Sequence, residues 1–500
     1  MKRNGTDGGR RAGGSITVYL ALTLAVMVSL ILASITSVKI RAGRMQAANA
    51  MDQAMYSLFA KYDRQLDETY ALFFLDAGSA SGGLDFAACV DELEDAADYL
   101  LRPNRGRRLF GGRNLLHLTR DSCSLTGCTL ATDAGGAAFR AEAVQAVKDT
   151  GGLALIRRLR ERKKAAGKRQ KAGREYLRGA QKKSYGSLTQ QAAEKRRKEE
   201  ERRAALAAEG VETEAEPPAL PEGFMNPIPM LEQLTSASVL DLVAPDGVSA
   251  KKADPGDLVS GRSLGKGFGV MRADTGGSEL AFKAYLLDHY RTYRNPSVHS
   301  VLSYQLEYIL CGKSSDLDNM KETVRYLMLN READNIACLY ANPSLSRSLS
   351  RTADLIGLSL GVPELAPAFK LVLAGLWAYA ESVVDLRCLL TGGRVSLTKQ
   401  AAYWQTAPDS LIGAGADLDG LVKSDPSGLD YEEYLGIILL ERQGSLVMRA
   451  MDMTEAEIRG NGNPGFRMDH CIYALSAEMK VCAEKRTTFP VSRSLCYGDL

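Results

Sequence analysis

The chain has 500 residues, of which 45% are hydrophobic, and its formal net charge is only +3. This length allows about three folding units, and the apolar content is ample for a buried core, which excludes a largely disordered chain. The charge balance conceals a strongly basic middle region, so local charge says more about partners than the whole chain does. No two of the nine cysteines are spaced C-x-x-C, which argues against zinc ribbons and thioredoxin-type redox chemistry.

The N-terminus carries the longest apolar run of the sequence. Residues 1–14 form a basic leader, and residues 15–38 are uncharged and mostly apolar. A helix of this length spans roughly 36 Å, enough to cross a hydrocarbon core of about 30 Å, so we expect one transmembrane helix. Four basic residues precede it and three follow closely, which favours a cytoplasmic N-terminus. A cleaved secretory signal is the rival interpretation, but the run is longer than the usual apolar core of a signal and no clear A-x-A site closes it.

Helical periodicity continues beyond the membrane segment. Apolar residues recur at intervals of three and four through residues 39–76, with charged residues between them. The pattern predicts one continuous helix, approximately residues 15–74, whose second half is an amphipathic stalk that packs on the globular part. The stripe comprises Met51, Met55, Leu58, Tyr62, Leu66, Thr69 and Phe73.

Residues 77–156 are expected to form a small α+β region. Residues 84–101 have helical periodicity, and a second helix is predicted at residues 137–149. Between them, two short strands are predicted at residues 114–119 and 123–132, around a turn at Gly127.

The predicted hairpin brings two cysteines together. If the loop has an even length, Cys123 and Cys128 lie opposite each other, within bridging distance. The pair is therefore a candidate disulfide, which an extracytoplasmic location permits but does not require.

A strongly basic segment follows. Residues 157–203 hold 19 Lys and Arg against 6 Glu, with almost no large apolar side chains. Residues 157–221 are therefore expected to form a solvated helical excursion with a Pro-rich end, which leaves and re-enters the globule. A nucleic-acid arm is the alternative, but aromatic stacking is limited to Tyr176 and Tyr185, which favours contact with an anionic envelope instead. Residues 222–278 are expected to be a loop-rich linker.

Residues 279–500 are predicted to form a helical bundle with a C-terminal strand. The apolar run 369–380 raises the question of a second membrane span, but charged residues bracket only about a dozen uncharged ones, so we expect the central helix of the bundle. The fold class is therefore mainly α, with a long N-terminal transmembrane and stalk helix and a bundle ectodomain that includes a small antiparallel β element. The predicted helices are 280–293, 298–310, 317–329, 332–340, 345–360, 365–390, 431–440 and 445–459, and the predicted strand is 471–484.

Catalytic and cofactor motifs are scarce. The sequence has no P-loop, G-x-S-x-G or H-E-x-x-H motif, and its four histidines are scattered. The glycines of SLGKGFG, at positions 265, 267 and 269, suggest a phosphate loop, but neither a preceding strand nor a following helix is evident, so a flexible loop is predicted. We expect no cofactor, no metal ligands and no catalytic residues.

One group of charged residues in the bundle stands out. Glu381 and Asp385 lie one helical turn apart, with Arg387 nearby and Glu307 on another helix of the same bundle. Two carboxylates on one face can perform acid–base chemistry, but no histidine or nucleophile accompanies them. The favoured interpretation is a polar cluster of caps and ion pairs that holds the bundle helices together.

Five segments carry a family resemblance: GSITVYLALTL (14–24), FAKYDRQLDETYALFFLD (59–76), YQLEYILCGKSSDLDNM (304–320), LAGLWAYAESVVDLRCLLTGG (373–393) and YEEYLGIILL (431–440). They resemble the uncharacterised membrane-anchored proteins encoded beside tight-adherence (Tad) pilus genes in Gram-positive bacteria, whose N-termini look like those of the TadE and TadG pseudopilins. The resemblance implies a domain of unknown function in the cell envelope, and it supplies a context without a chemistry.

The first of these segments contains a candidate processing site between Gly14 and Ser15. Prepilin-type cleavage after a glycine usually goes with a glutamate at the fifth mature position, whereas cleavage here would place Tyr19 there. This departure from the pattern of the family favours an uncleaved, membrane-resident accessory subunit.

The sequence thus predicts a single-pass protein of the cell membrane, with a cytoplasmic N-terminus and an extracytoplasmic C-terminal domain. Its expected role is a non-enzymatic component of Tad-type pilus assembly. The expected partners are membrane lipid and proteins of a pilus assembly machine, with no nucleic acid and no small-molecule substrate. The alternatives are a cell-envelope hydrolase that uses the bundle carboxylates and a surface adhesin or sensor.

Overall fold

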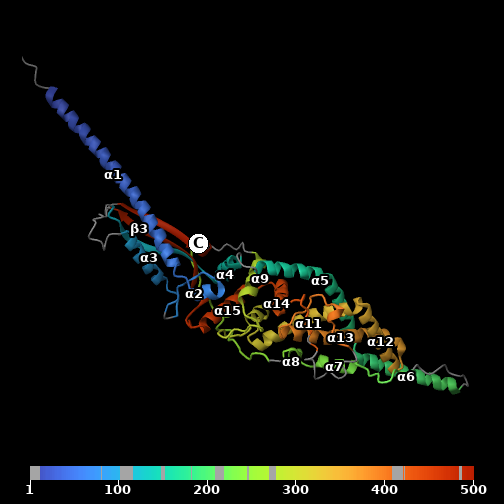
Figure 1. Ribbon diagram of the computed structural model, residues 1–500. Helices are drawn as coiled ribbons and strands as arrows, with labels where there is room; N and C mark the ends of the chain where they lie inside the picture. The colour runs from blue at the N-terminus through green and yellow to red at the C-terminus, as the bar shows by residue number, and fades with distance from the viewer. Residues whose placement is uncertain are drawn as a thin grey trace, which may run out of the picture.

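The computed structural model describes residues 12–79, 82–101, 116–147, 152–181, 183–208, 219–244, 247–269, 278–407, 421, 423–483 and 487–499. Within these residues, fifteen α-helices and one small antiparallel sheet of four strands form an elongated molecule that is 64% helical (Figure 1), which confirms the predicted fold class. The elements of the N-terminal half are α1 (Ala12–Phe59), α2 (Arg64–Tyr70), β1 (Leu75–Asp76), α3 (Phe86–Leu101), β2 (Thr119–Leu130), α4 (Asp133–Val147), α5 (Gly152–Gln181), α6 (Tyr185–Ala208), α7 (Ile228–Ser236) and α8 (Val239–Val243). Those of the C-terminal half are α9 (Glu279–His289), α10 (Gln305–Cys311), α11 (Asp316–Ala341), α12 (Pro343–Ser359), α13 (Ala366–Leu390), α14 (Tyr431–Glu441), α15 (Leu446–Gly460), β3 (Cys471–Ala483) and β4 (Thr487–Cys496).

Helix α1 has two parts with opposite surroundings. The side chains of residues 16–37 are all exposed, and those of Met51, Met55 and Leu58 are buried against α3 and the sheet. Among the described residues, α1 is the one helix long and apolar enough to cross a membrane. Figure 1 shows its first part leaving one end of the molecule. The basic leader lies largely outside the described residues.

The predicted continuous helix to residue 74 is wrong, because α1 ends at Phe59. Asp63 starts the separate helix α2, and its side chain accepts a hydrogen bond from the backbone N–H of Leu66 at 2.9 Å. Helix α2 ends at Tyr70, and the next residue, Ala71, caps it with a left-handed φ of 52°. A capped restart is invisible to apolar periodicity, which continues through both helices in nearly the same phase.

Strand β3 is the centre of the sheet. It pairs antiparallel with β1, β2 and β4, and its bounds confirm the predicted C-terminal strand. The predicted hairpin around Gly127 is wrong, because residues 119–130 form the single strand β2, with a register shift at Gly127 against β3. Cys123 and Cys128 therefore lie on one strand, roughly 16 Å apart along it. Both are free thiols, and this separation is far beyond the reach of a disulfide.

The predicted bundle is present. Helix α13 is its central helix, since it packs against α11, α12, α5 and α7 and buries Phe369 and Trp377 completely. The break predicted near residue 330 is wrong, because α11 runs unbroken from Asp316 to Ala341. Helix α10 is shorter than predicted, and residues 290–304 before it form turns and loops.

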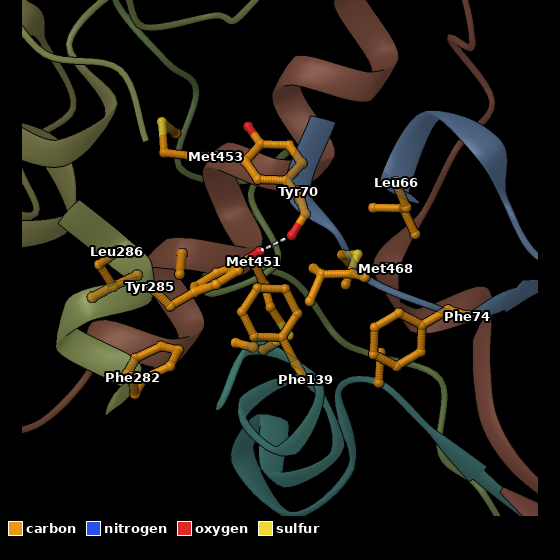
Figure 2. Close-up of a cluster of buried hydrophobic side chains, with 14 of the residues drawn as sticks. Leu66, Tyr70, Phe74, Phe139, Phe282, Tyr285, Leu286, Met451, Met453 and Met468 are labelled. Atoms are coloured by element: carbon orange, nitrogen blue, oxygen red, sulfur yellow. Dashed lines mark hydrogen bonds between the residues drawn. The ribbon is translucent and has the colours of Figure 1, made fainter. Parts of the chain in front are cut away.

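A cluster of buried aromatic and methionine side chains joins the sheet region to the bundle. Figure 2 shows side chains from α2, α4, α9 and α15 converging in it. The Tyr285 hydroxyl donates a 2.8 Å hydrogen bond to the backbone carbonyl of Tyr70 within this cluster. Because close-packed cores resist deformation, the two regions are held as one body. The labelled members are Leu66, Tyr70, Phe74, Phe139, Phe282, Tyr285, Leu286, Met451, Met453 and Met468.

The basic segment is only partly the solvated excursion that the sequence predicts. Helix α5 packs against α11, α9 and α13, and it buries Ile156, Leu159 and Leu177. By contrast, α6 is exposed almost throughout its second half and lies at the end of the molecule opposite α1 (Figure 1). The prediction therefore fails for α5 and holds for most of α6.

Candidate functional site

A cluster of buried charged side chains lies between α11, α13 and the segment that follows α13. Asp385 is at its centre. Its Oδ2 accepts hydrogen bonds from Nη2 of Arg331 at 2.8 Å and from Nδ2 of Asn335 at 3.0 Å, and its Oδ1 accepts one from Nζ of Lys399 at 2.6 Å. Asp385, Arg331 and Lys399 are each at most 3% exposed. The Asp385 carboxylate is thus enclosed by protein groups on both oxygens.

Glu381, one turn earlier on α13, holds the segment that follows the helix. Its Oε1 lies 2.6 Å from Nζ of Lys399, and its Oε2 accepts hydrogen bonds from the backbone N–H of Thr406 at 2.9 Å and from the Thr406 hydroxyl at 2.7 Å. The indole N–H of Trp377 donates to the same hydroxyl at 3.0 Å. One face of α13 thereby fixes residues 399–406 against the bundle.

The cluster reaches the basic helix α5 through Arg169. Its Nε lies 3.6 Å from Oδ1 of Asp334 on α11, and its Nη2 donates a 2.9 Å hydrogen bond to the carbonyl oxygen of Lys399. The Asp334 side chain is fully buried and accepts a hydrogen bond from the backbone N–H of Lys399. The charges balance, with three cations and three carboxylates: Arg169, Arg331 and Lys399 with Asp334, Glu381 and Asp385.

The electrostatics of the cluster are those of a structural ion-pair network. Burial alone would raise the pKa of Asp385, but the charges of Arg331 and Lys399 hold that pKa below its ordinary value. Burial alone would lower the pKa of Lys399, but Asp385 and Glu381 raise it above the ordinary value. The Asp385–Lys399 pair is therefore charged at neutral pH, whereas a general acid or base needs a pKa close to the working pH.

The structure gives Glu307 a different environment. It lies on α10, fully buried, and its Oε1 accepts hydrogen bonds from the backbone N–H of Tyr293 and from the Tyr431 hydroxyl, both at 2.8 Å. Burial raises the pKa of Glu307 to about 7, against these hydrogen bonds, which lower it. The Glu307 carboxyl therefore titrates near neutral pH, and its Oε1 is held by hydrogen bonds and not by an ion pair.

Of the four residues predicted to form a polar cluster, the structure brings Glu381 and Asp385 together through their shared partner Lys399. Arg387 is half-buried further along α13, and the cations that bind Asp385 are Arg331 and Lys399 instead. The sequence held one overlooked signal. Arg331 falls within the apolar stripe of α11, and a charged side chain in such a stripe requires a buried partner.

The glycine-rich segment is fixed in place, in contrast to the predicted flexible loop. The backbone N–H of Gly265 donates to Oδ2 of Asp469 at 3.0 Å, and that of Gly267 donates to Oδ1 of Asp133 at 3.1 Å. Phe268 forms an isolated bridge with Cys128 of β2. Carboxylates of the chain itself occupy the amides that a phosphate would need.

The candidate processing site lies within the first turn of α1. Gly14 and Ser15 have helical backbone, and the helix continues through them without a break. The described residues contain no cluster of His, Cys, Asp and Glu suited to a metal ion.

These features define a mainly helical protein with one apolar N-terminal helix, a small sheet and a bundle built around a buried charge cluster. Residues 219–483 match a family of unknown function, DUF5702. Because the match covers more than half of the chain, the protein belongs to this family. The matched region contains all of the cluster except Arg169. No curated protein and no solved structure matches the chain.

Proposed function

We propose that the protein is a non-enzymatic, membrane-anchored component of Tad-type pilus assembly, with an uncleaved pseudopilin-like N-terminus. The observation that carries this proposal is the path of α1. Its apolar first part has no cover within the described chain, and its second part is built into the core beneath α3 and the sheet. Exposed apolar surface of this extent must be covered by lipid or by apolar helices of other subunits.

The same helix supports a mechanical role. Helix α1 runs unbroken from the apolar part into the folded part, and the cluster in Figure 2 ties that part to the bundle. A displacement of the helix in the membrane would therefore move the whole body. The basic leader and the modest excess of charge before the apolar run favour a cytoplasmic N-terminus and an extracytoplasmic bundle.

The proposal of a non-enzymatic role rests on the carboxylates. Glu381 and Asp385 are the residues that a hydrolase in this bundle would use, and both are buried and bound to Lys399. Catalytic carboxylates need contact with substrate, and these two contact residues of the same chain.

Deletion of the gene in its natural host tests the proposal. We expect loss of surface pili in electron micrographs and rescue by the wild-type gene. A photo-crosslinking residue at exposed Leu22 should capture pilus subunits or platform proteins, and the same probe at exposed Tyr56, beyond the apolar part, serves as control. Normal pili in the deletion strain would refute the proposal. Loss of an envelope-degrading activity with normal pili would support the hydrolase instead.

A further inference from the structure

Helix α5 carries two sets of cations with different surroundings. The first set pairs with carboxylates of the helices beneath it. Nη2 of Arg158 lies 3.0 Å from Oε1 of Glu433, and Nζ of Lys163 lies 2.6 Å from Oε1 of Glu441. The third member, Arg169, belongs to the buried cluster. These three cations hold α5 on the bundle.

The second set forms a basic ridge on the opposite, solvent-facing side of α5. Its six members recur at intervals of three, four or seven residues, so they lie on one face of the helix and cover roughly 32 Å of its length. All six are exposed, and none forms an ion pair with any other described residue. The ridge consists of Arg157, Arg160, Lys164, Lys168, Lys171 and Arg178.

This arrangement costs helix stability. Like charges four residues apart, such as Arg160 and Lys164 or Lys164 and Lys168, destabilise a helix by roughly 0.2–0.5 kcal/mol per pair. Helix α6 avoids that cost by mixing signs, as in the pair Glu194 and Lys198. Helix α5 has eleven Lys and Arg against only two Glu, Glu161 and Glu175, so its exposed face keeps a large positive excess that suits an anionic partner.

We propose that the basic ridge of α5 binds a linear phosphodiester polymer that lacks bases. Neighbouring ridge cations are spaced roughly 4.5–6 Å along the axis for intervals of three and four residues, which suits a chain that carries a charge in every backbone repeat. Arg and Lys both donate strong charge-assisted hydrogen bonds to phosphate oxygens. The inference does not depend on a role in pilus assembly.

The aromatic residues near the ridge disfavour nucleic acid. Tyr176 on α5 stacks on Tyr340 with ring centroids 4.2 Å apart, which occupies one face of its ring. Tyr185 is held by a 2.7 Å hydrogen bond between its hydroxyl and Asn226. Tyr176 is 41% exposed and leaves one ring face free, so the described residues beside the ridge offer at most one such platform, whereas binding of successive bases uses several.

The position of the ridge disfavours a lipid surface. Figure 1 shows α5 lying along the bundle, with the sheet region between it and the apolar part of α1. A bilayer that contains the apolar part of α1 would meet the near end of the molecule. It could not contact the full length of the ridge at once, whereas a linear polymer can follow it.

The test uses the full-length chain in nanodiscs of zwitterionic lipid. Fluorescence anisotropy measures the binding of labelled poly(glycerol phosphate) at several salt concentrations. The ridge variant carries Arg160→Gln, Lys164→Gln, Lys168→Gln and Lys171→Gln. The control variant carries the same change in charge on α6: Arg197→Gln, Lys198→Gln, Arg202→Gln and Arg203→Gln.

The ridge variant should bind at least about tenfold more weakly, and its salt dependence should decrease by roughly three units of slope, because each lost phosphate contact removes close to one unit. The control should change affinity less than about twofold. If the quadruple ridge variant does not fold, Lys164→Gln against Lys198→Gln gives the same comparison, with a slope difference of roughly one.

Four outcomes would overturn the proposal. They are no binding of the polymer by the wild-type protein, equal weakening in both variants, tighter binding of single-stranded DNA with the same number of phosphates, and loss of polymer binding when the nanodisc contains anionic lipid. The third outcome would assign the ridge to nucleic acid, and the fourth would assign it to the membrane.

Discussion

Helices α5 and α6 come from one continuous basic stretch of sequence and have opposite surroundings. Helix α5 lies on the bundle and contributes Ile156, Leu159 and Ala166 to its buried surface. Helix α6 is tied to the bundle through buried Leu188 and Ala192 and through an ion pair between Lys195 and Glu364, and its later residues are exposed. Both helices are rich in charged residues, and α5, the more basic of the two, is the one that is buried, so charge does not explain the difference in burial. The difference arises from a few small and apolar residues at helical spacing.

Glycine explains how closely α5 approaches its neighbour. A Cβ at Gly173 would collide with the backbone carbonyl oxygen of Ala333 on α11, so the two helices touch through backbone atoms. Gly186 on α6 has no heavy atom within 4 Å of the same position. A glycine such as Gly173 is buried at this contact, but it adds almost nothing to the apolar periodicity of the sequence. The comparison therefore suggests that a basic segment belongs to a core when its small residues recur on one face.

The largest expected effect comes from the buried ion pairs beneath α5. Lys399→Met should lower the free energy of unfolding by about 3–5 kcal/mol, because it leaves Glu381 and Asp385 buried without their shared cation. Lys198→Met on α6, which removes an exposed pair with Glu194, should leave the melting temperature unchanged. Chemical denaturation of both variants measures the contrast. Equal effects would mean that the cluster does not anchor the bundle.

The next effect concerns the close approach of α5 to α11. Gly173→Ala should destabilise the protein by about 2–3 kcal/mol, because the added methyl group forces the helices apart. Gly167→Ala, on the same helix, and Gly186→Ala, on α6, meet open space and should stabilise it by about 0.5–1 kcal/mol. Thermal melts of the three variants would decide the matter. Stabilisation by Gly173→Ala would show that α5 does not pack as described.

The sequence predicted the elements that bury large apolar side chains better than those that bury small or polar ones. Apolar periodicity located α3, α9, α12, α13 and β3 to within a few residues, since large apolar side chains mark their buried faces. It failed where burial uses other means, as with the small residues of α5 and the Asp63 cap that separates α1 from α2. Strand β4 was missed because its alternation is weak and Pro490 lies within it.

The candidate site shows a similar limit. Glu381 and Asp385 were found because they share one helix face, which their spacing predicts. Their partner Lys399 lies in an irregular segment. Arg331 lies on α11, 54 residues before Asp385 in the sequence. Pairing across such separations depends on tertiary packing. Only the presence of a charge within the apolar stripe of α11 hinted at it.

A smaller expected effect is on the pH dependence of stability, which a buried carboxyl should change and an exposed one should not. The folded pKa of Glu307 is about 7 and its ordinary value is 4.5, so folding favours the protonated form. Ionisation of Glu307 therefore does not reduce the free energy of unfolding below about pH 4.5, and it reduces this free energy progressively as the pH rises to about 7. Glu307→Gln removes this reduction, so it should stabilise the protein by about 1–2 kcal/mol more at pH 8 than at pH 5.

The matched control for this pH effect is Glu199→Gln on α6, whose side chain is half exposed and pairs with Arg202. It should leave the pH dependence of the denaturation midpoint unchanged. If Glu307→Gln instead lowers stability equally at both pH values, the carboxyl at Glu307 contributes hydrogen bonds that an amide cannot replace.

The smallest effect should come from shortening α6. Removal of residues 197–218, with a short Gly-Ser joint, should shift the melting temperature by no more than about 2 °C, because residues 197–205 are exposed. Removal of a segment of similar length from α5, residues 157–178, should abolish the cooperative transition, because it takes away Leu159, Ala166 and Leu177 from two cores and Arg169 from the buried cluster. Differential scanning calorimetry of the two deletions compares the helices directly. A large shift for the α6 deletion would mean that its exposed half, and not only its first turns, contributes to the fold.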